Sequence, residues 1–466
     1  MLFSSIPFLY YFLPCVLTLY FIVPKQMKNG VLFLSSLVFY GWGEPKYLIF
    51  MLISITQGYF LGILIEKYRG TKRSKFFLAV SVILSLFMLG YFKYTDFFIS
   101  NVNAVTGLSI PLLKVTLPIG ISFYTFQILS YSVDVYRNEV KAQKNYLDLA
   151  TYIAMFPQLV AGPIVRYSEI EKQLKSRIHT VENTAKGIRR FLIGLAKKIL
   201  IANLLGQGIA SFQASDSKSV LFCWLYAISY MLHIYFDFSG YSDMAIGLGQ
   251  ILGFHFPENF DYPYVSKSIT EFWRRWHISL GSWFRDYLYI PLGGNRVGKA
   301  RWFLNIFLVW AATGFWHGAQ WTFILWGILF AILLIIEKMW LLPFLKKAKV
   351  FNHLYVLSIV AISFVIFDAP SITQAFSLIA DMFGAGGLPF ISLESVYYLQ
   401  NYGVILILAS IGATPIVKKL LHSAKKKKFL NAILQIAEPI FLVILLALCT
   451  AFLVDGSFNP FLYFRF

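Results

Sequence analysis

Long apolar runs recur along this chain from Phe8 to Val454, and they constrain its fold more than any other feature. A helix needs about 20 apolar residues to cross a bilayer. A transmembrane barrel would instead show alternating segments of about ten residues, which the sequence lacks. The pattern indicates an all-α, polytopic membrane protein, and we expect membrane helices over 6–24, 30–43, 47–66, 76–93, 116–135, 190–211, 219–237, 302–316, 321–341, 353–368, 397–417 and 431–454.

The basic residues indicate which loops face the cytoplasm. A net charge of +19 would suggest a nucleic-acid partner in a soluble protein, but here the basic residues gather in short loops, as in cytoplasmic loops of membrane proteins. Anionic lipids attract such loops by about 1 kcal/mol per basic residue. We therefore expect no nucleic-acid partner, contacts with anionic lipids, both chain termini on the outer side, and cytoplasmic clusters at 25–28, 67–75, 346–349 and 418–428.

The first apolar run is expected to remain as a helix. No charged residue precedes it and no small-residue cleavage site follows it, so it does not have the pattern of a signal peptide. The cysteines stand singly in apolar runs, and we predict neither a disulfide framework nor a metal site from Cys15, Cys223 and Cys449.

Two regions do not fit simple membrane helices. The stretch 155–170, MFPQLVAGPIVRYSEI, is apolar but contains two prolines and a glycine, so we expect a re-entrant or bent segment that the protein buries or water lines. The stretch 237–301 is too polar to cross a membrane and too aromatic for a solvated loop. Mixtures of arginine, tryptophan and tyrosine favour the membrane interface, so we expect short helices at the inner leaflet there.

Two histidines are candidate functional residues, because an unpartnered polar group at membrane depth is costly. His317 lies in TGFWHGAQ between two apolar runs, and His277 lies in FWRRWHISLGSWFRDY among charged residues. Neutral imidazole is a general base. His317 is therefore a candidate catalytic group, although a histidine that only bonds a neighbouring helix has the same pattern. A third, His233, either is a hydrogen-bonded structural histidine, the interpretation we favour, or pairs with Asp237 one helical turn later.

The motifs around His277 and His317 resemble those of a known family. FWRRWHISLGSWFRDYLYIPLGGNR, followed downstream by TGFWHGAQWTFILWG, is similar to the membrane-bound O-acyltransferase family, and within it to the bacterial alginate O-acetylases and peptidoglycan O-acetyltransferases. The stretches 117–137, 156–167 and 235–249 and the final FNPFLYFRF are also similar to that branch. The resemblance implies one membrane domain over 1–466, with about 11 or 12 membrane helices and further re-entrant and interfacial helices around a central tunnel.

The resemblance also implies roles for individual residues. It implies that His317 is catalytic, deprotonating an acceptor hydroxyl, and that His277 holds the donor or polarises its carbonyl. The donor would be a cytoplasmic thioester, acetyl-CoA in the acetylating branch, with no bound cofactor or metal. Arginines suit phosphates or an acidic carrier as well as lipid headgroups, so donor or tunnel roles are expected for Arg274, Arg275, Arg285 and Asp286. A further group of polar residues is expected to line the tunnel or to cap a helix: Asp237, Ser239, Tyr241 and Asp243.

The C-terminal tail, 457–466, has two interpretations. The expected topology places it outside the membrane, where Tyr463 and Arg465 suit an interfacial anchor. Alternatively, Tyr463 is a relay that accepts the acyl group. It would then pass the group to an extracytoplasmic, hydrolase-like O-acetyltransferase, which is the partner that the resemblance implies.

Two other functions are weighed against acetylation. D-alanyl transfer from a carrier protein toward teichoic acid occurs in the same family, but there a separate small protein supplies the tail that this chain carries itself. A channel or transporter with a histidine gate would predict repeated halves and paired intramembrane charges, and the sequence reveals neither. The sequence therefore favours O-acetylation of a cell-wall polymer or exopolysaccharide, of peptidoglycan or alginate type, at a bacterial cytoplasmic membrane.

Overall fold

The computed structural model describes residues 1–456, and the regular elements over that range are all helices. Each range that the apolar runs predicted contains a helix, which confirms a polytopic helical membrane protein. The tail with Tyr463 and Arg465 lies outside the described residues. Within residues 1–456, eight segments are long and apolar enough to cross a membrane: Pro45–Lys67, Lys72–Thr106, Val181–Ala214, Val220–Ile251, Trp321–Lys347, Phe351–Asp368, Leu393–Gly412 and Lys428–Val454.

Four other predicted membrane helices are present but are short or less apolar. α1 (Leu13–Ile22) extends a π-helical turn that begins at Pro7. α2 (Lys28–Gly41) has 14 residues and α5 (Ile121–Tyr136) has 16. A helix that crosses a bilayer needs about 20 residues. α14 (Lys299–His317) has 19 residues but begins with the basic turn KARW. By length and composition alone, eight helices within residues 1–456 are therefore able to cross a membrane.

The chain forms two compact units. Unit 1 comprises Met1–Phe191 and Met244–Pro257, and unit 2 comprises Leu192–Asp243 and the chain from Glu258 onward. Two long helices, α9 (Val181–Ala196) and α11 (Val220–Ile251), contribute residues to both units. Each unit buries its own set of aromatic and aliphatic side chains.

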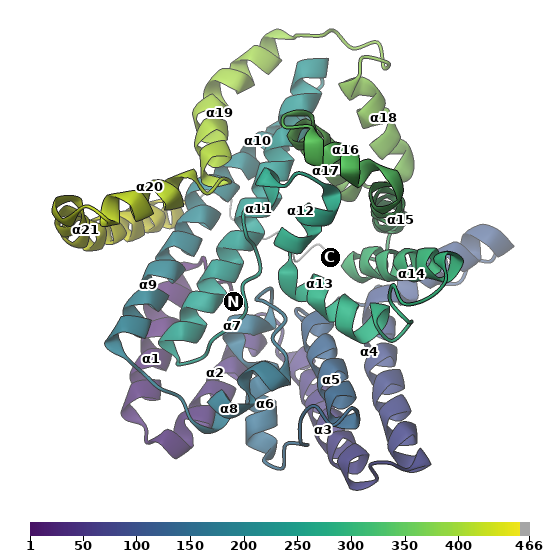
Figure 1. The fold of residues 1–466 in the computed structure, drawn as a ribbon, viewed down its shortest axis with the longest axis vertical. Coiled ribbons are helices and arrows are strands. Elements are labelled where there is room, and N and C mark those ends of the chain that lie inside the picture. Colours follow the sequence, from purple (N-terminus) through teal and green to yellow (C-terminus); the bar gives the residue numbers. More distant parts are fainter. Residues whose placement is uncertain (457–466) are drawn as a thin grey trace. The chain divides into compact units, whose positions relative to one another are not determined.

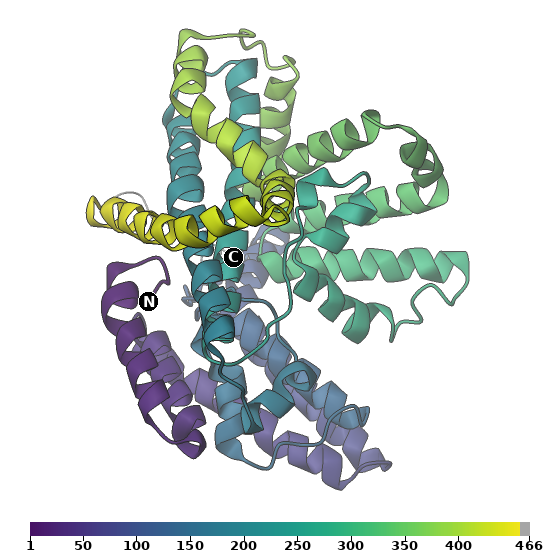
Figure 2. The ribbon, with the colours of Figure 1, turned by 60° about the vertical axis from the view of Figure 1, so that its left-hand side comes forward.

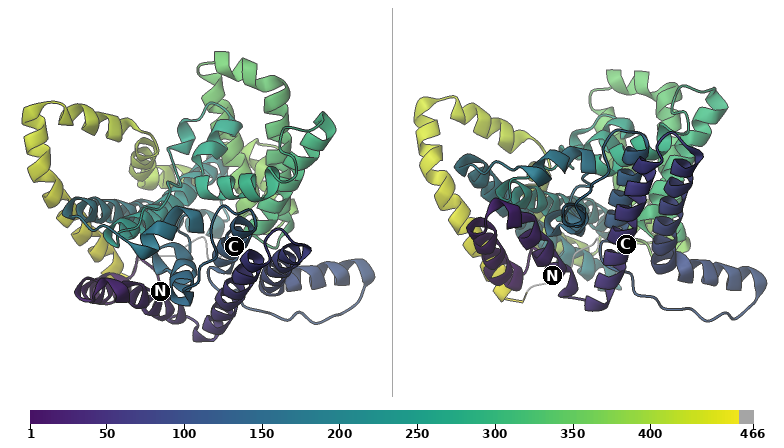
Figure 3. Two further views of the ribbon diagram at one scale, coloured as in Figure 1. Left: turned by 60° about the horizontal axis from the view of Figure 1, so that its bottom comes forward. Right: turned by 90° about the horizontal axis from the view of Figure 1, so that it is seen from below.

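Three helices of unit 1 pack against one another and lie side by side in Figure 1: α3 (Leu48–Lys67), α4 (Lys72–Thr106) and α5. Their close packing depends on small residues, because an added Cβ at Gly62 would lie 2.8 Å from the Tyr131 ring. The far end of α4 is followed by an extended segment that runs back along it (Figure 3), where the Leu113 N–H donates to Asp96 Oδ1 at 2.8 Å.

The bent segment predicted around the two prolines is also part of unit 1. It follows α6 (Tyr146–Ala154) and consists of the single turn α7 (Phe156–Leu159), extended backbone, and then α8 (Tyr167–Lys175). Residues 155–165 are all buried, and the Phe156 N–H donates to Ser36 Oγ at 3.0 Å. The prediction of a bent segment is confirmed, and of the two surroundings that irregular backbone at membrane depth tolerates, protein or water, the structure shows burial by protein.

An aromatic core holds unit 2 together. α14 and α15 (Trp321–Ile336) run side by side because Gly314 and Gly327 let their backbones come into contact (Figure 1). α17 (Phe351–Asp368) packs on α15, and α18 (Ile372–Met382) packs on α17. This unit also contains α10 (Asn203–Ala214), α16 (Leu342–Lys347) and the three helices that end the described chain, drawn from green to yellow in Figure 2: α19 (Leu393–Gly412), α20 (Ile416–Lys425) and α21 (Lys428–Val454).

The region 237–301 agrees with the prediction only in part. Short helices are confirmed at α12 (Ile269–Arg275) and α13 (Ile278–Phe284), and the π-helical turn η6 (Arg285–Tyr289) follows them. The prediction was wrong at its beginning, because α11 continues to Ile251. The helix accommodates its polar side chains because the protein buries them away from lipid. Four residues thus lie within a membrane helix and do not cap one: Asp237, Ser239, Tyr241 and Asp243.

Candidate active site

The two candidate histidines lie near each other in unit 2. His317 is the last residue of α14, and His277 lies between α12 and α13. Both are buried, with 7% and 2% of their surface exposed. The Trp316 ring centroid lies 5.0 Å from that of His317 and 6.1 Å from that of His277. The fold therefore brings together beside one indole the two histidines that the motifs singled out.

Aromatic rings surround His317. The rings of Trp326 and Phe367 lie edge to face with its imidazole, with centroids 5.3 Å away in each case. Gly318, the next residue, lets the Phe323 ring approach so closely that an added Cβ would collide with it. These rings exclude water from one side of the imidazole, which strengthens its polar interactions with a substrate bound beside it.

Asn259 orients the His277 ring. Its Oδ1 accepts hydrogen bonds from the Ser279 backbone N–H at 3.2 Å and hydroxyl at 2.9 Å, and lies 3.1 Å from His277 Nδ1. Because a backbone N–H can only donate, the atom facing it is the amide oxygen, and His277 Nδ1 must carry the proton. Nε2 of the neutral ring then keeps its lone pair. In this tautomer, neutral His277 offers a hydrogen-bond acceptor at Nε2.

The backbone conformation of His277 and its burial also indicate a functional residue with a neutral imidazole. His277 has a φ of 45°, in the left-handed region that residues other than glycine rarely adopt, and the next N–H, of Ile278, donates to the Asn259 carbonyl at 3.0 Å. Burial, and then the neighbouring His317, lower the pKa of His277 well below its ordinary value, so its imidazole is neutral at pH 7. Backbone held in an uncommon conformation is typical of functional sites.

A cavity of about 570 Å³ opens at His277. Side chains of α12, α13, α14 and α15 line it, and they combine apolar walls, including Val309 and Trp310, with the cations Arg274, Arg285 and Lys338. Small-molecule sites have volumes of about 300–1,000 Å³ and carry a few polar groups on apolar walls. The cavity therefore has the size and the charge for an anionic ligand whose reactive end reaches His277.

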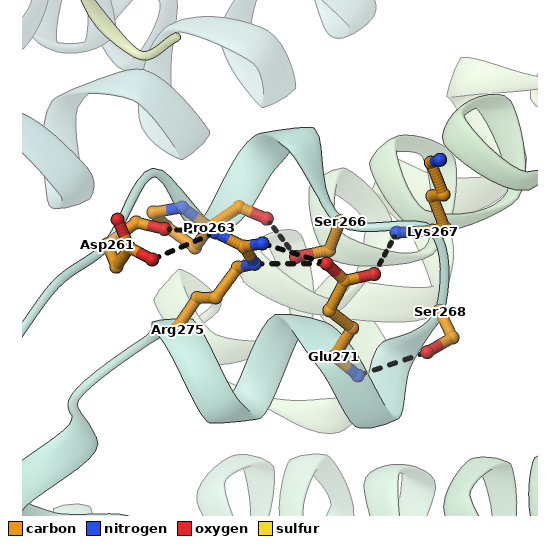
Figure 4. Close-up of polar contacts among 7 residues, drawn as sticks. All are labelled: Asp261, Pro263, Ser266, Lys267, Ser268, Glu271 and Arg275. Carbon is orange, nitrogen blue, oxygen red and sulfur yellow. Dashed lines mark hydrogen bonds and ion pairs between the residues drawn. The ribbon is translucent and has the colours of Figure 1, made fainter. Parts of the chain in front are cut away.

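The predicted charged residues divide between this cavity and its support. Arg274 and Arg285 line the cavity, and Asp286 forms an ion pair with Arg285 at 2.6 Å. Arg275 instead contacts the carboxylates of Asp261 and Glu271, each at 3.0 Å (Figure 4). Arg275 thus ties α12 to the loop before it, and the structure does not place it among the residues that line the cavity.

Glu337 and Lys338 were not predicted from the sequence. Glu337 is buried and accepts hydrogen bonds from the Ile269 N–H, at 2.5 Å, and from the backbone and hydroxyl of Thr270, at 2.8 and 2.7 Å. It therefore fixes the first turn of α12, the helix that carries Arg274. The available signal was an acid–base pair, EK, at the end of a long apolar run.

Asp237, in α11, forms a buried ion pair with Lys198 of the π-helical segment Lys197–Ala202. Their charged atoms lie 2.6 Å apart, and neither side chain is more than 2% exposed. His233 Nδ1 lies 2.7 Å from the Ala202 carbonyl, which supports the favoured interpretation of His233 as a hydrogen-bonded structural histidine over its pairing with Asp237. The expectation of no paired charges within membrane helices was wrong, since Lys198 and Asp237 both lie in candidate spans. All four predicted tunnel residues are absent from the lining of the cavity: Asp237, Ser239, Tyr241 and Asp243.

The fold and the site together define a class of protein. It is a multi-pass helical membrane protein in which two buried histidines lie beside one tryptophan, and one of them, His277, lines a cavity with three cations. His317 is not among the residues that line this cavity. Within residues 1–456, no three His, Cys, Asp or Glu side chains group as metal ligands. Residues 46–379 match the model of the MBOAT, membrane-bound O-acyltransferase family. The chain belongs to this family and is a membrane O-acyltransferase.

Proteins with similar sequences indicate which branch of the family this chain resembles. The chain is 37% identical to the probable alginate O-acetylase of Azotobacter vinelandii over 100% of both chains. It is 35% identical to the peptidoglycan O-acetyltransferase of Helicobacter pylori, over 88% of this chain and 85% of that one. The teichoic acid D-alanyltransferase of Bacillus subtilis is 32% identical over 46% of this chain and 58% of its own length. The resemblance read from the motifs is confirmed.

Proposed function

We propose that this protein moves an acetyl group from a cytoplasmic thioester, acetyl-CoA, to serve O-acetylation of an extracytoplasmic polysaccharide of alginate or peptidoglycan type. The observation that carries the proposal is a single cavity that joins a buried, oriented histidine to three cations, Arg274, Arg285 and Lys338. Such cations suit the phosphates of a CoA-type donor. The relatives that match most of the chain are named for O-acetylation, which supports acetyl as the group transferred.

The proposed chemistry is attack of an acceptor hydroxyl on the thioester carbonyl. His317 takes the hydroxyl proton as the C–O bond forms, and the C–S bond then breaks. The thiolate that leaves takes up the proton from His317, so the products are an O-acetyl ester and the free thiol. His277, an acceptor at Nε2, orients an N–H of the donor's amide-containing arm or the acceptor hydroxyl itself.

The route across the membrane completes the proposal. The donor is made in the cytoplasm and the polymer lies outside, so acyl transfer within the membrane connects the two. An extracytoplasmic, hydrolase-like O-acetyltransferase receives the group, either directly or through Tyr463. Both termini then lie outside a bacterial cytoplasmic membrane, with the four basic clusters inside, in agreement with their distribution along the sequence.

The direct test uses purified full-length protein with isotopically labelled acetyl-CoA and a soluble oligosaccharide acceptor. We expect release of free CoA and, by mass spectrometry, a labelled acetyl ester. D-alanyl transfer is the competing function, and relatives named for it match about half of this chain. Transfer of D-alanine from a carrier protein, with no turnover of acetyl-CoA, would overturn the proposal in favour of that function.

Removing the cavity's arginines should weaken donor binding. We expect Arg274→Gln/Arg285→Gln to raise the KM for acetyl-CoA about tenfold or more with a smaller change in kcat, since hydrogen bonds to charged groups contribute about 1.5–3 kcal/mol each. Arg296→Gln is the matched control, because Arg296 is exposed, lies shortly after η6, and does not line the cavity. Steady-state kinetics over a range of donor concentrations measures both constants. An unchanged KM in the double variant would remove the donor from this cavity.

Replacing Asn259 with aspartate should shift the pH profile. Wild-type His277 has a lowered pKa, so its neutral form persists to pH values below the ordinary range of histidine. A carboxylate at position 259 favours the imidazolium and raises that pKa. We therefore expect the acid limb of kcat/KM against pH to move to higher pH in Asn259→Asp, with activity approaching that of the wild type at alkaline pH. Superimposable acid limbs would show that His277 is not required in its neutral form.

A further inference from the structure

A basic cluster in unit 1 lies around the ring of Tyr20, near the end of the first apolar helix. Lys28 Nζ lies 4.3 Å from the centroid of this ring, and the Arg177 guanidinium carbon lies 5.8 Å from it. The Tyr20 hydroxyl donates to the Leu252 carbonyl at 2.7 Å and lies 3.0 Å from His179 Nε2. Because its single proton is engaged with the carbonyl, His179 Nε2 must donate to it. Tyr20 thus holds Lys28, Arg177 and His179 together.

The charges of this cluster are not balanced by nearby acids. Burial, and then the charges of Arg177 and Lys25, lower the pKa of Lys28 below its ordinary value, and burial followed by the charge of Lys28 lowers that of His179. Asp148 is the acid that acts on Arg177, and its carboxylate already accepts from Asn29 at 2.7 Å. Mutual repulsion of this kind is relieved by a bound anion.

Arg177 gives independent evidence for a missing acceptor. Its Nη1 atom is buried, and it has no hydrogen-bond partner among residues 1–456. A buried, unsatisfied donor on a charged group is costly, so native proteins rarely leave one without an acceptor. The guanidinium carbon lies 4.5 Å from the centroid of the Phe254 ring, and the group also interacts with the Tyr20 hydroxyl, so it is held in place beside the cluster. An oxyanion bound beside the cluster would satisfy Nη1.

The surroundings favour a lipid as the source of that anion. The adjacent end of the first helix exposes Leu19, Phe21 and Ile22, and Ile22 is 76% exposed. A strip of apolar side chains that ends at a group of cations matches an acyl chain that ends at a phosphate. We propose that Lys25, Lys28, Arg177 and His179 bind the phosphate headgroup of an anionic phospholipid whose acyl chains lie along the first helix. This site is independent of the proposed acyl transfer.

Native mass spectrometry of the full chain in detergent tests the site. Phosphatidylglycerol is titrated, with phosphatidylcholine as the zwitterionic lipid and inorganic phosphate as the free anion. We expect wild type to retain one phosphatidylglycerol at least about tenfold more tightly than phosphatidylcholine, and Lys28→Gln/Arg177→Gln to lose most of that preference. Lys418→Gln/Lys419→Gln removes the same charge from the exposed surface of α20 and should leave this high-affinity binding unchanged.

Two further variants guard against a folding defect. Arg177→Lys keeps the charge and should keep most of the preference. Lys25→Gln alters an exposed side chain, so it leaves the fold intact and should weaken binding a few-fold. Equal binding of the two lipids, or equal losses in the α20 control and the cluster variant, would overturn the site. If millimolar inorganic phosphate displaced phosphatidylglycerol, the ligand of the site would be a free anion and not a lipid.

Discussion

Replacing His317 with alanine should reduce acyl transfer to background while the protein remains folded. General-base catalysis by a positioned histidine contributes about 10²–10⁴-fold to rate, and we expect a loss in kcat of that size. The expectation rests on the position of the imidazole, which lies beside Trp316 and is enclosed by Trp326 and Phe367. Turnover of acetyl-CoA by purified variant and wild type, normalised to folded protein, measures it.

Two comparisons separate catalysis from packing. His317→Gln retains most of the side-chain volume and a hydrogen-bonding group but is not a base, so it should be as inactive as alanine. His233→Gln is the matched control, because His233 is also buried in a membrane helix, bonds the Ala202 carbonyl, and has no part in the proposed reaction. An amide N–H can replace that bond, so activity should be near that of the wild type. Transfer within a few-fold of wild type in His317→Gln would remove His317 from the reaction.

The positions of the helices and of the two histidines could be predicted, for different reasons. Apolar runs gave each predicted helix, because a bilayer requires long apolar segments whatever their neighbours are. His277 and His317 were found because each lies in a long, distinctive motif. Neither kind of signal depends on knowing which residues meet in space.

What the sequence did not reveal depends on contacts between distant residues. α11 was expected to end near Asp237, since a carboxylate argues against a membrane helix, but Lys198 neutralises it from another helix. Asn259 lies in the loop PENF, where asparagine usually marks a turn, and only the fold shows its oxygen beside His277. Arg274 and Arg275 are adjacent and chemically alike, and the direction of α12 decides which of them reaches the cavity.

Breaking the Lys198–Asp237 pair should destabilise the protein severely. Lys198→Met leaves a carboxylate that is buried in a membrane helix, and removing one partner of a buried pair costs about 3–5 kcal/mol. The expected result is a large fall in apparent melting temperature in detergent, or loss of folded protein from the membrane. The variant should also lose acyl transfer, because Asp237 is next to Phe238 in the chain. The Phe238 ring centroid lies 4.7 Å from that of His277, so displacement of this part of α11 would also displace His277.

The neighbouring pair supplies a matched control. Lys197 and Asp243 are also 2.6 Å apart, but their side chains are 24% and 18% exposed, so solvent offsets part of the loss and Lys197→Met should lower the melting temperature less than Lys198→Met does. The double variant Lys198→Met/Asp237→Leu removes both buried charges. Replacing a buried pair by apolar side chains is often neutral or stabilising, and it should recover most of the melting temperature lost in Lys198→Met. Equal melting temperatures for the single and double variants would show that the uncompensated carboxylate is not the cause. Recovery of stability without acyl transfer would mean that the charges themselves, carried on the π-helical segment Lys197–Ala202 and on α11, are needed to position Phe238 and His277.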